Sequence, residues 1–211
     1  MRHIFYILFL LFVYAANTAF GQNLDGNVLI VIDSIPLFED PNPVLNKINP
    51  NDIQEIVVIK NKDKIDSTGW GKYDGIVYIF TKLYTSRPDS IKAIPSMKNM
   101  IRKKNQWHLH KSVFPYTGYF INYFYSGRKE SEGYLDNGLL NGSVTFYDPD
   151  GHITDEVNYV MDIPHGIETR YYKNGTMMQK GAFLNGKKDG LWEIYHQNGM
   201  LKQQTQFTNG K

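Results

Sequence analysis

A period of 24 residues constrains the fold of this chain more than any other feature. In the C-terminal half, three interleaved series share this interval. The first series pairs a tyrosine with the glycine four residues later: Tyr123 and Gly127, Tyr147 and Gly151, Tyr171 and Gly175, Tyr195 and Gly199. The second series is Gly118, Gly142, Gly166 and Gly190. The third is an Asn-Gly pair at 137–138, 185–186 and 209–210, interrupted once near Asp162. Chance does not produce three series at one period, so we expect an array of like units over 118–211.

Each unit is predicted to be one β-hairpin. Segments such as Tyr171-Tyr-Lys-Asn-Gly175 end an apolar run with turn-forming residues and a glycine that tolerates positive φ. The segments that follow alternate apolar and polar residues, which indicates strands with one buried face and one solvated face. One apolar column recurs at the 24-residue step: Leu135, Tyr159, Phe183 and Phe207. We expect neighbouring hairpins to stack this column and to form a core collectively, because a single hairpin is only marginally stable.

Two of the units, Gly166–Gly175 and Gly190–Gly199, resemble MORN repeats in the bacterial variant described as antitoxin-like. Both share a glycine, aromatic residues and a closing Asn-Gly. The resemblance spans 118–211 and implies elongated antiparallel sheets that serve as scaffolds or binding surfaces and not as catalysts. Two places depart from the family pattern. Ile-Pro-His at 163–165 replaces a polar turn, and Ser126-Gly127 lacks the asparagine. At both places we expect a different bend or a different mode of binding.

The N-terminus has the layout of a secretory signal peptide, which we assign to residues 1–21. An apolar run from Ile4 to Tyr14 is followed by small and polar residues ending in Ala19-Phe20-Gly21. The run is shorter than the roughly 20 residues that a transmembrane helix needs, so no span is expected after signal removal. The chain has no cysteine, which argues against a disulfide-stabilised eukaryotic extracellular domain and a lipoprotein anchor. We therefore expect export to the periplasm or outer-membrane surface of a bacterium.

Residues 22–83 are predicted to form a small α+β domain. β-rich runs at 28–32, 55–60 and 75–82 are separated by a short helix near 43–48 and a turn at Asn49-Pro50. Over 27–82 this order resembles the plug domain of TonB-dependent outer-membrane receptors, although Ser34 stands where that family has glycine. The resemblance implies the plug fold. No barrel sequence follows, so we expect no receptor or pore role.

Residues 84–117 lack a clear period and are predicted to be a linker with one helix from Ser96 to Lys104. This segment contains a basic cluster: Lys98, Arg102, Lys103 and Lys104. Such a cluster is usually a solvated face, and the alternative is contact with acidic lipid or peptidoglycan-associated groups.

No motif predicts catalysis, a cofactor or a metal. Residues 181–188 fit most of a phosphate-binding loop, but Lys188 stands where serine or threonine should bind magnesium, and the segment lies inside a repeat. His108 and His110 have a spacing that a metal can use, yet no third ligand is marked. Asp33 and Asp52 sit at predicted turns, the ordinary place for aspartate. The formal net charge of +2 gives no electrostatic reason to expect nucleic acid binding.

The tyrosine column is the one candidate site: Tyr123, Tyr147, Tyr171 and Tyr195. Regular aromatics along a sheet usually pack across strands. The alternative is an exposed stripe that holds a protein or surface partner, since aromatics are enriched at interfaces. Sequence parity cannot distinguish these cases, because both faces of the first strand of each hairpin carry apolar residues.

The sequence therefore predicts a mainly β protein, with a plug-like α+β unit followed by an elongated antiparallel sheet of stacked hairpins. The first functional hypothesis is an exported, non-enzymatic interaction or scaffold protein of the bacterial envelope, with an envelope protein or surface as its partner. The second is an antitoxin-like repeat protein in the cytoplasm. The third is an enzyme acting on cell-wall glycan, with a site where the two halves meet. The oligomeric state is left open.

Overall fold

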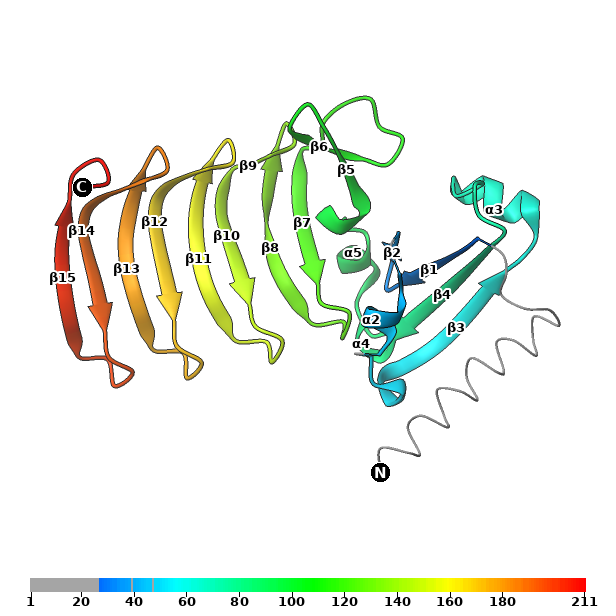
Figure 1. Ribbon diagram of the computed structural model, residues 1–211, viewed down its shortest axis with the longest axis horizontal. Coiled ribbons are helices and arrows are strands. Elements are labelled where there is room, and N and C mark those ends of the chain that lie inside the picture. Colours follow the sequence, from blue (N-terminus) through cyan, green and yellow to red (C-terminus); the bar gives the residue numbers. More distant parts are fainter. Residues whose placement is uncertain (1–26, 39, 47) are drawn as a thin grey trace. The chain divides into compact units, whose positions relative to one another are not determined.

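The computed structural model describes residues 27–38, 40–46 and 48–211 (Figure 1). The predicted signal peptide lies outside these residues. The chain divides into two compact units, residues 1–86 and 87–211, and each is described by itself. Among the helices of the described residues, none has the length and apolar character needed to cross a bilayer.

The described part of unit 1 is a four-stranded mixed sheet with short helices. Its strands are β1 (Val28–Ile32), β2 (Ile35–Leu37), β3 (Ile53–Ile59) and β4 (Gly75–Thr81), in the order β2-β1-β4-β3. Only the β1–β4 pairing is parallel. The helices are α2 (Asn42–Leu45), η1 (Pro50–Asp52), α3 (Lys62–Thr68) and α4 (Lys82–Thr85). The core is a cluster of Leu29, Val31, Ile65, Tyr73 and Ile76, so α3 contributes its one buried residue, Ile65, to the sheet. The expected small α+β unit is confirmed.

The turn between β1 and β2 contains Asp33 and Ser34, and its geometry explains the role of each. Asp33 and Ser34 both have positive φ, 48° and 72°. The Asp33 carboxylate is buried and accepts hydrogen bonds from the backbone N–H of Thr81 at 2.7 Å and from its hydroxyl at 2.5 Å. The aspartate thus ties the turn to the end of β4, and Ser34 occupies a conformation that glycine adopts more easily.

Unit 2 is dominated by one antiparallel sheet whose strands follow one another in chain order (Figure 1). The strands are β7 (Gly118–Tyr123), β8 (Lys129–Asp136), β9 (Leu139–Leu140), β10 (Gly142–Tyr147), β11 (Ile153–Val160), β12 (Ile163–Tyr171), β13 (Met177–Leu184), β14 (Lys187–Tyr195) and β15 (Leu201–Phe207). All pairings are antiparallel, and β9 pairs only with β8. The stacked-hairpin prediction is confirmed.

The three glycine-rich series occupy three kinds of bend. Gly127, Gly151, Gly175 and Gly199 close identical loops, in which the glycine N–H bonds the carbonyl three residues earlier. The Asn-Gly pairs are two-residue turns with positive φ at both residues, 51° and 80° at Asn185 and Gly186. Gly142, Gly166 and Gly190 also have positive φ, between 73° and 98°, at the start or the bulge of a strand. Positive φ therefore explains why glycine recurs at all three positions.

The interrupted turn keeps the geometry of the others. Met161 and Asp162 have φ of 51° and 67°, close to the values of the Asn-Gly turns. The Asp162 carboxylate accepts a hydrogen bond from the Leu140 N–H at 2.6 Å and lies 3.2 Å from the guanidinium of Arg102. Contacts outside the turn therefore hold a conformation that these two residues do not favour on their own.

The segment expected to be a linker is structured over 87–117 and packs on the repeat sheet. It contains α5 (Asp89–Lys92), η2 (Met97–Asn99), β5 (Met100–Lys103) and β6 (Gln106–Leu109). The predicted helix from Ser96 to Lys104 is wrong, because that stretch is η2 followed by a strand that pairs with β6. Met100 joins Phe120, Leu135 and Val144 in the main core cluster, with Trp107 and Tyr116 packed against it. We call residues 87–117 the cap.

Candidate binding surface

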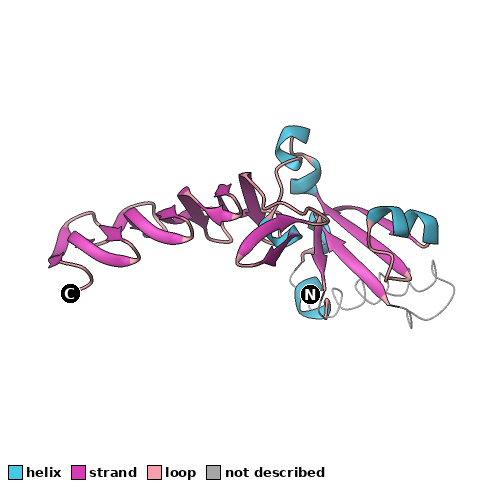
Figure 2. Cartoon of the chain, turned by 90° about the horizontal axis from the view of Figure 1, so that it is seen from above, coloured by secondary structure: helices cyan, strands magenta, loops and turns pink. Residues whose placement is uncertain are grey.

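The two faces of the repeat sheet differ in chemistry. One face, here the core face, carries a column that is buried throughout: Phe120, Val144, Glu168 and Trp192. The cap covers this face over β7, β8 and β10, and its cluster extends to Tyr159 on β11. The opposite face, here the tyrosine face, carries Glu156 and Thr169, which are direct cross-strand partners, and the hydroxyl of Tyr171 that bonds Glu156. Figure 2 shows the later hairpins of unit 2 as a single layer.

A register shift accompanies each tyrosine of the column. The ladder slips at the end of the first strand of every hairpin, between Asn122 and Tyr123, Phe146 and Tyr147, Arg170 and Tyr171, and Ile194 and Tyr195. The extra residue lies on the second strand of each hairpin, so each tyrosine keeps the regular alternation of its own strand. The four tyrosines therefore occupy equivalent positions next to equivalent loops.

Two of the tyrosines form a repeated pair with a glutamate of the preceding strand. Tyr147 donates a hydrogen bond to Glu132, and Tyr171 donates one to Glu156 at 2.6 Å. Both glutamates lie 15 residues before their tyrosine and 24 residues apart. In the last unit Lys180 takes that place, and Tyr195 bonds Glu193 on its own strand at 2.7 Å. The hydroxyls of these three tyrosines are therefore held by carboxylates of the same sheet.

These hydrogen bonds raise the pKa of Tyr147 and Tyr171 and lower the pKa of Glu132. The bond to Glu156, together with burial, raises the pKa of Tyr171 to about 12. Burial and the bond to Glu132 raise the pKa of Tyr147. Burial would raise the pKa of Glu132, but the bonds from Lys129 and Tyr147 outweigh it and the pKa is lowered. The phenols therefore stay protonated donors and the carboxylate stays ionised at neutral pH.

Tyr123 has a different environment from the other three. It is buried, and the guanidinium of Arg87 from the cap lies 3.5 Å from the centre of its ring. Tyr147, Tyr171 and Tyr195 are half-buried. The structure thus places the column partly under the cap and partly against cross-strand glutamates; a partner-binding role for it stays a prediction.

Five of the exposed apolar groups of the tyrosine face are aliphatic side chains on β11 to β14. They form a set that we call the aliphatic patch: Val160, Ile163, Ile167, Leu184 and Leu191. Each is between 45% and 50% exposed. Val160 and Ile163 are direct partners across β11 and β12, and Leu191 lies 24 residues after Ile167. Clustered exposed apolar side chains of this kind mark interaction surfaces more often than scattered ones do.

The core face carries charge where the cap ends. Glu168 is buried in the same column as Phe120 and Val144, and its carboxylate lies 2.9 Å from the Arg170 guanidinium. Arg170 also lies 3.1 Å from Asp155, so two carboxylates share one half-exposed arginine. A buried carboxylate needs such a partner, because an unpaired buried charge is strongly destabilising.

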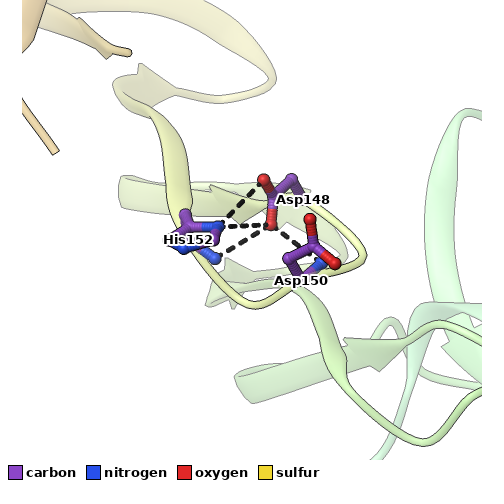
Figure 3. A group of neighbouring side chains, drawn as sticks. All are labelled: Asp148, Asp150 and His152. Atoms are coloured by element: carbon purple, nitrogen blue, oxygen red, sulfur yellow. Dashed lines mark hydrogen bonds and ion pairs between the residues drawn. The ribbon is translucent and has the colours of Figure 1, made fainter. Parts of the chain in front are cut away.

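The three metal-type side chains that the structure brings together belong to a turn. Ligand atoms of Asp148, Asp150 and His152 lie within 4.8 Å of one another (Figure 3). The Asp148 carboxylate already accepts bonds from the N–H groups of Asp150 and His152, both at 2.9 Å. The Asp150 carboxylate lies 2.5 Å from Lys173. These contacts account for the group as a loop motif.

Other sequence candidates are placed apart or absorbed into the fold. His108 is buried on β6 whereas His110 is exposed beyond the strand, and neither belongs to the metal-type group of the described residues. Residues 181–188 form the end of β13, a turn and the start of β14, so no helix follows the loop. In the basic cluster, Lys98 bonds the Tyr123 carbonyl and Arg102 pairs with Asp162, so both hold the cap to the sheet.

Sequence reasoning missed the glutamates that bind the tyrosines and the aliphatic patch. A signal for the first was present: the column 132, 156, 180 and 204 reads Glu, Glu, Lys, Gln, in step with the tyrosines. The patch had a weaker signal. Ile167 and Leu191 each come one residue before a core-face position, and only the pairing register shows that these two residues point to the exposed face.

Comparison with known proteins identifies the repeats. A family model described as a MORN repeat variant matches three consecutive segments, residues 140–161, 164–185 and 188–209. A comparison with curated proteins found no match. MORN repeats are generally protein- or membrane-binding repeats and typically not catalytic. The sheet from residue 140 to residue 209 is therefore built from MORN repeats.

Proposed function

We propose that this chain is an exported, non-enzymatic binding protein of the bacterial cell envelope, and that it holds a protein or surface partner on the tyrosine face of its repeat sheet. The observation that carries the proposal is the aliphatic patch, which spans four adjacent strands with each member about half exposed. A soluble surface normally scatters such groups, and burying them against a partner would be favourable by about 25 cal/mol per Å² of apolar area.

The polar frame around the patch supports binding by a preformed surface. The tyrosine hydroxyls and their glutamates are fixed by hydrogen bonds within the sheet, so a partner meets groups that are already ordered. Preorganised side chains lose little conformational entropy on association.

Export is supported by the sequence alone, through the signal-peptide layout of residues 1–21. A plug-like identity for unit 1 belongs to the same proposal. Its supports are the order of strands and turns and the positive φ of Ser34, where the plug family has glycine.

The binding proposal is tested by crosslinking in the native host, followed by mass spectrometry of the captured species. The variant replaces Ile167 and Leu191 of the patch by lysine. The matched control replaces Leu83 and Met200 by lysine, since both are exposed apolar residues that lie outside the patch, in α4 and in a loop. Loss of the same partner in the patch variant, with retention in the control, supports the proposal. Equal capture by both variants would remove the patch as the binding surface.

Export has a separate test. Fractionation and N-terminal sequencing should find the chain beginning near Gln22 in the periplasm or outer membrane. An intact Met1 in the cytoplasm would overturn the localisation and favour the antitoxin-like alternative.

A further inference from the structure

The most exposed large apolar side chains of the described residues lie in one loop of the cap, residues 110–117, which we call the cap loop. Val113 is 83% exposed and Phe114 is 78% exposed, and the two are neighbours in the chain. Exposed apolar groups that lie together mark an interaction site, whereas single ones are ordinary. The cap loop belongs neither to the matched repeats nor to the aliphatic patch.

Hydrogen bonds hold the backbone of the cap loop. The Ser112 N–H donates to the Leu109 carbonyl at 2.9 Å, across a turn in which Lys111 has a φ of 71°. The Ser112 hydroxyl accepts a bond from the Phe114 N–H at 3.2 Å and donates one to the Phe114 carbonyl at 2.8 Å. The side chains of Val113 and Phe114 take no part in these bonds, so an ordered loop presents them to solvent.

Three lysines lie beside the two apolar residues. Lys111 precedes them in the same loop, and Lys103 and Lys104 lie at the turn between β5 and β6. That turn reaches the cap loop, because the Lys103 ammonium lies 3.5 Å from the Ser112 carbonyl. All three lysines are exposed, and none of them forms an ion pair with a carboxylate of the described residues.

The sequence around the cap loop contains no acidic residue. From residue 90 to residue 129 there is no aspartate or glutamate, although the whole chain has 21 in 211 residues. The basic residues of the same stretch are Lys92, Lys98, Arg102, Lys103, Lys104, Lys111, Arg128 and Lys129. The formal charge of this stretch is therefore positive, and its electrostatic complement is an anionic surface.

We propose that the cap loop inserts Val113 and Phe114 into the interface of an anionic lipid bilayer, while the three lysines beside it contact lipid phosphates. This inference does not rest on the proposed function, because it uses a different surface. Apolar side chains enter the boundary between headgroups and acyl chains, and each lysine near an anionic bilayer adds electrostatic attraction. A protein partner fits this chemistry less well, because lysine is depleted at protein–protein interfaces.

The first test measures binding of the chain, as isolated from its native host, to vesicles by sedimentation. The anionic vesicles contain phosphatidylglycerol and phosphatidylcholine, and vesicles of phosphatidylcholine alone are the neutral comparison. The apolar variant replaces Val113 and Phe114 by serine. Its control makes the same change at Met200 and Leu201, which are also exposed apolar neighbours.

A second variant changes the charge and keeps the apolar residues. It replaces Lys103 and Lys111 by glutamate, and its control makes the same change at Lys187 and Lys202, which are exposed on the repeat sheet. All replaced side chains are exposed, so circular dichroism should show the fold of the wild type in every variant.

The wild type and both controls should bind the anionic vesicles, and this binding should weaken as the salt concentration rises. Both cap-loop variants should bind at least roughly tenfold more weakly. Equal binding by variants and controls, or equal binding of the wild type to neutral and anionic vesicles, would overturn the proposal. Absence of binding by the wild type would also overturn it and would leave a protein as the partner of the loop.

Insertion has its own test, because the chain has no native cysteine. A Val113→Cys variant that carries a polarity-sensitive fluorophore should shift its emission to shorter wavelength on anionic vesicles, and a Met200→Cys variant should not. The readout is local, so it separates the cap loop from membrane contact elsewhere in the chain. Unchanged emission from the probe at 113, or an equal shift at 200, would overturn insertion of the cap loop.

Discussion

The contact between Gly181 and Trp192 offers a sharp test of how the repeat sheet is packed. A Cβ placed on Gly181 would lie 2.1 Å from Cδ2 of the indole and 2.3 Å from Cε2. The indole cannot easily move, because its N–H donates to the Ala182 carbonyl at 3.0 Å and its ring meets Phe183 edge-on at 5.1 Å. We therefore expect Gly181→Ala to force the ring out of its site.

The size of the effect follows from two opposed terms. Overpacking a well-filled site costs about 1–3 kcal/mol, and a clash with an immobile ring belongs at the upper end. Glycine to alanine in a strand returns about 0.5–1 kcal/mol of backbone entropy. The net loss of unfolding free energy should be about 2 kcal/mol.

A double-mutant cycle isolates the contact. In a Trp192→Leu background the clash is absent, so Gly181→Ala should be neutral or slightly stabilising, with a coupling of about 2–3 kcal/mol. Urea unfolding followed by far-UV circular dichroism measures all four proteins, and a loss of 2 kcal/mol moves the midpoint by about 1 M for a slope near 2 kcal/mol/M. Gly133→Ala is a milder comparison, since its Cβ would lie 2.9 Å from a methyl of Val144. An equal cost of Gly181→Ala in both backgrounds would refute the reasoning.

Three further predictions concern the turns and charges of the sheet. Met161→Asn should raise the unfolding free energy by about 0.5–1 kcal/mol in urea unfolding, because asparagine tolerates the φ of 51° better than methionine does; no gain would mean that the turn is not strained. Arg170→Leu should cost about 3 kcal/mol, because it leaves the Glu168 carboxylate buried without its cation, whereas Glu168→Leu should change stability by less than about 1 kcal/mol; equal costs would contradict this account. The pKa of Tyr171 in the folded state, about 12, lies above the ordinary 10, so its stabilisation is fully present below pH 10 and is lost as the pH rises through 12. Glu156→Gln should lower this pKa in a tyrosinate absorbance titration, and an unchanged titration would show that the carboxylate is not its cause.

The sequence predicted those parts of the fold that depend on local conformation. The glycines at positions 175, 186 and 190 indicate positive φ directly. The 24-residue period then predicts the hairpins and their order along the sheet. Met161 and Asp162 mark the limit of that reasoning, because their turn has the same geometry with neither residue type that signals it. The geometry there is stabilised by Leu140 and Arg102, which are distant in sequence.

The cap could not be predicted from local pattern for the same reason. The stretch around Met100 has helix-compatible residues, but it is a strand because Met100 packs in the core beside Phe120 and pairs with Leu109. For the candidate site, the sequence predicted that the four tyrosines occupy equivalent positions in the repeats. Ile167, Thr169 and Tyr171 are alternate residues of β12 and therefore share one face. Which of the two faces is covered depends on where the cap packs, and that packing leaves no mark in the alternation of the sequence.

The core column carries a charge at one of its four positions, where the cap ends. Under the cap, the core column consists of apolar residues, Phe120 and Val144, whose burial is completed by the cap. Beyond β11 the same column carries Glu168, which pairs with the half-exposed Arg170, and then the buried Trp192. Over those same strands the tyrosine face exposes Ile167 and Leu191. A sheet that needed only to be soluble would carry polar or charged residues at these exposed positions. Over these strands the apolar Trp192 of the core face is buried, whereas Ile167 and Leu191 of the tyrosine face are about half exposed, which favours the tyrosine face as the side that meets a partner.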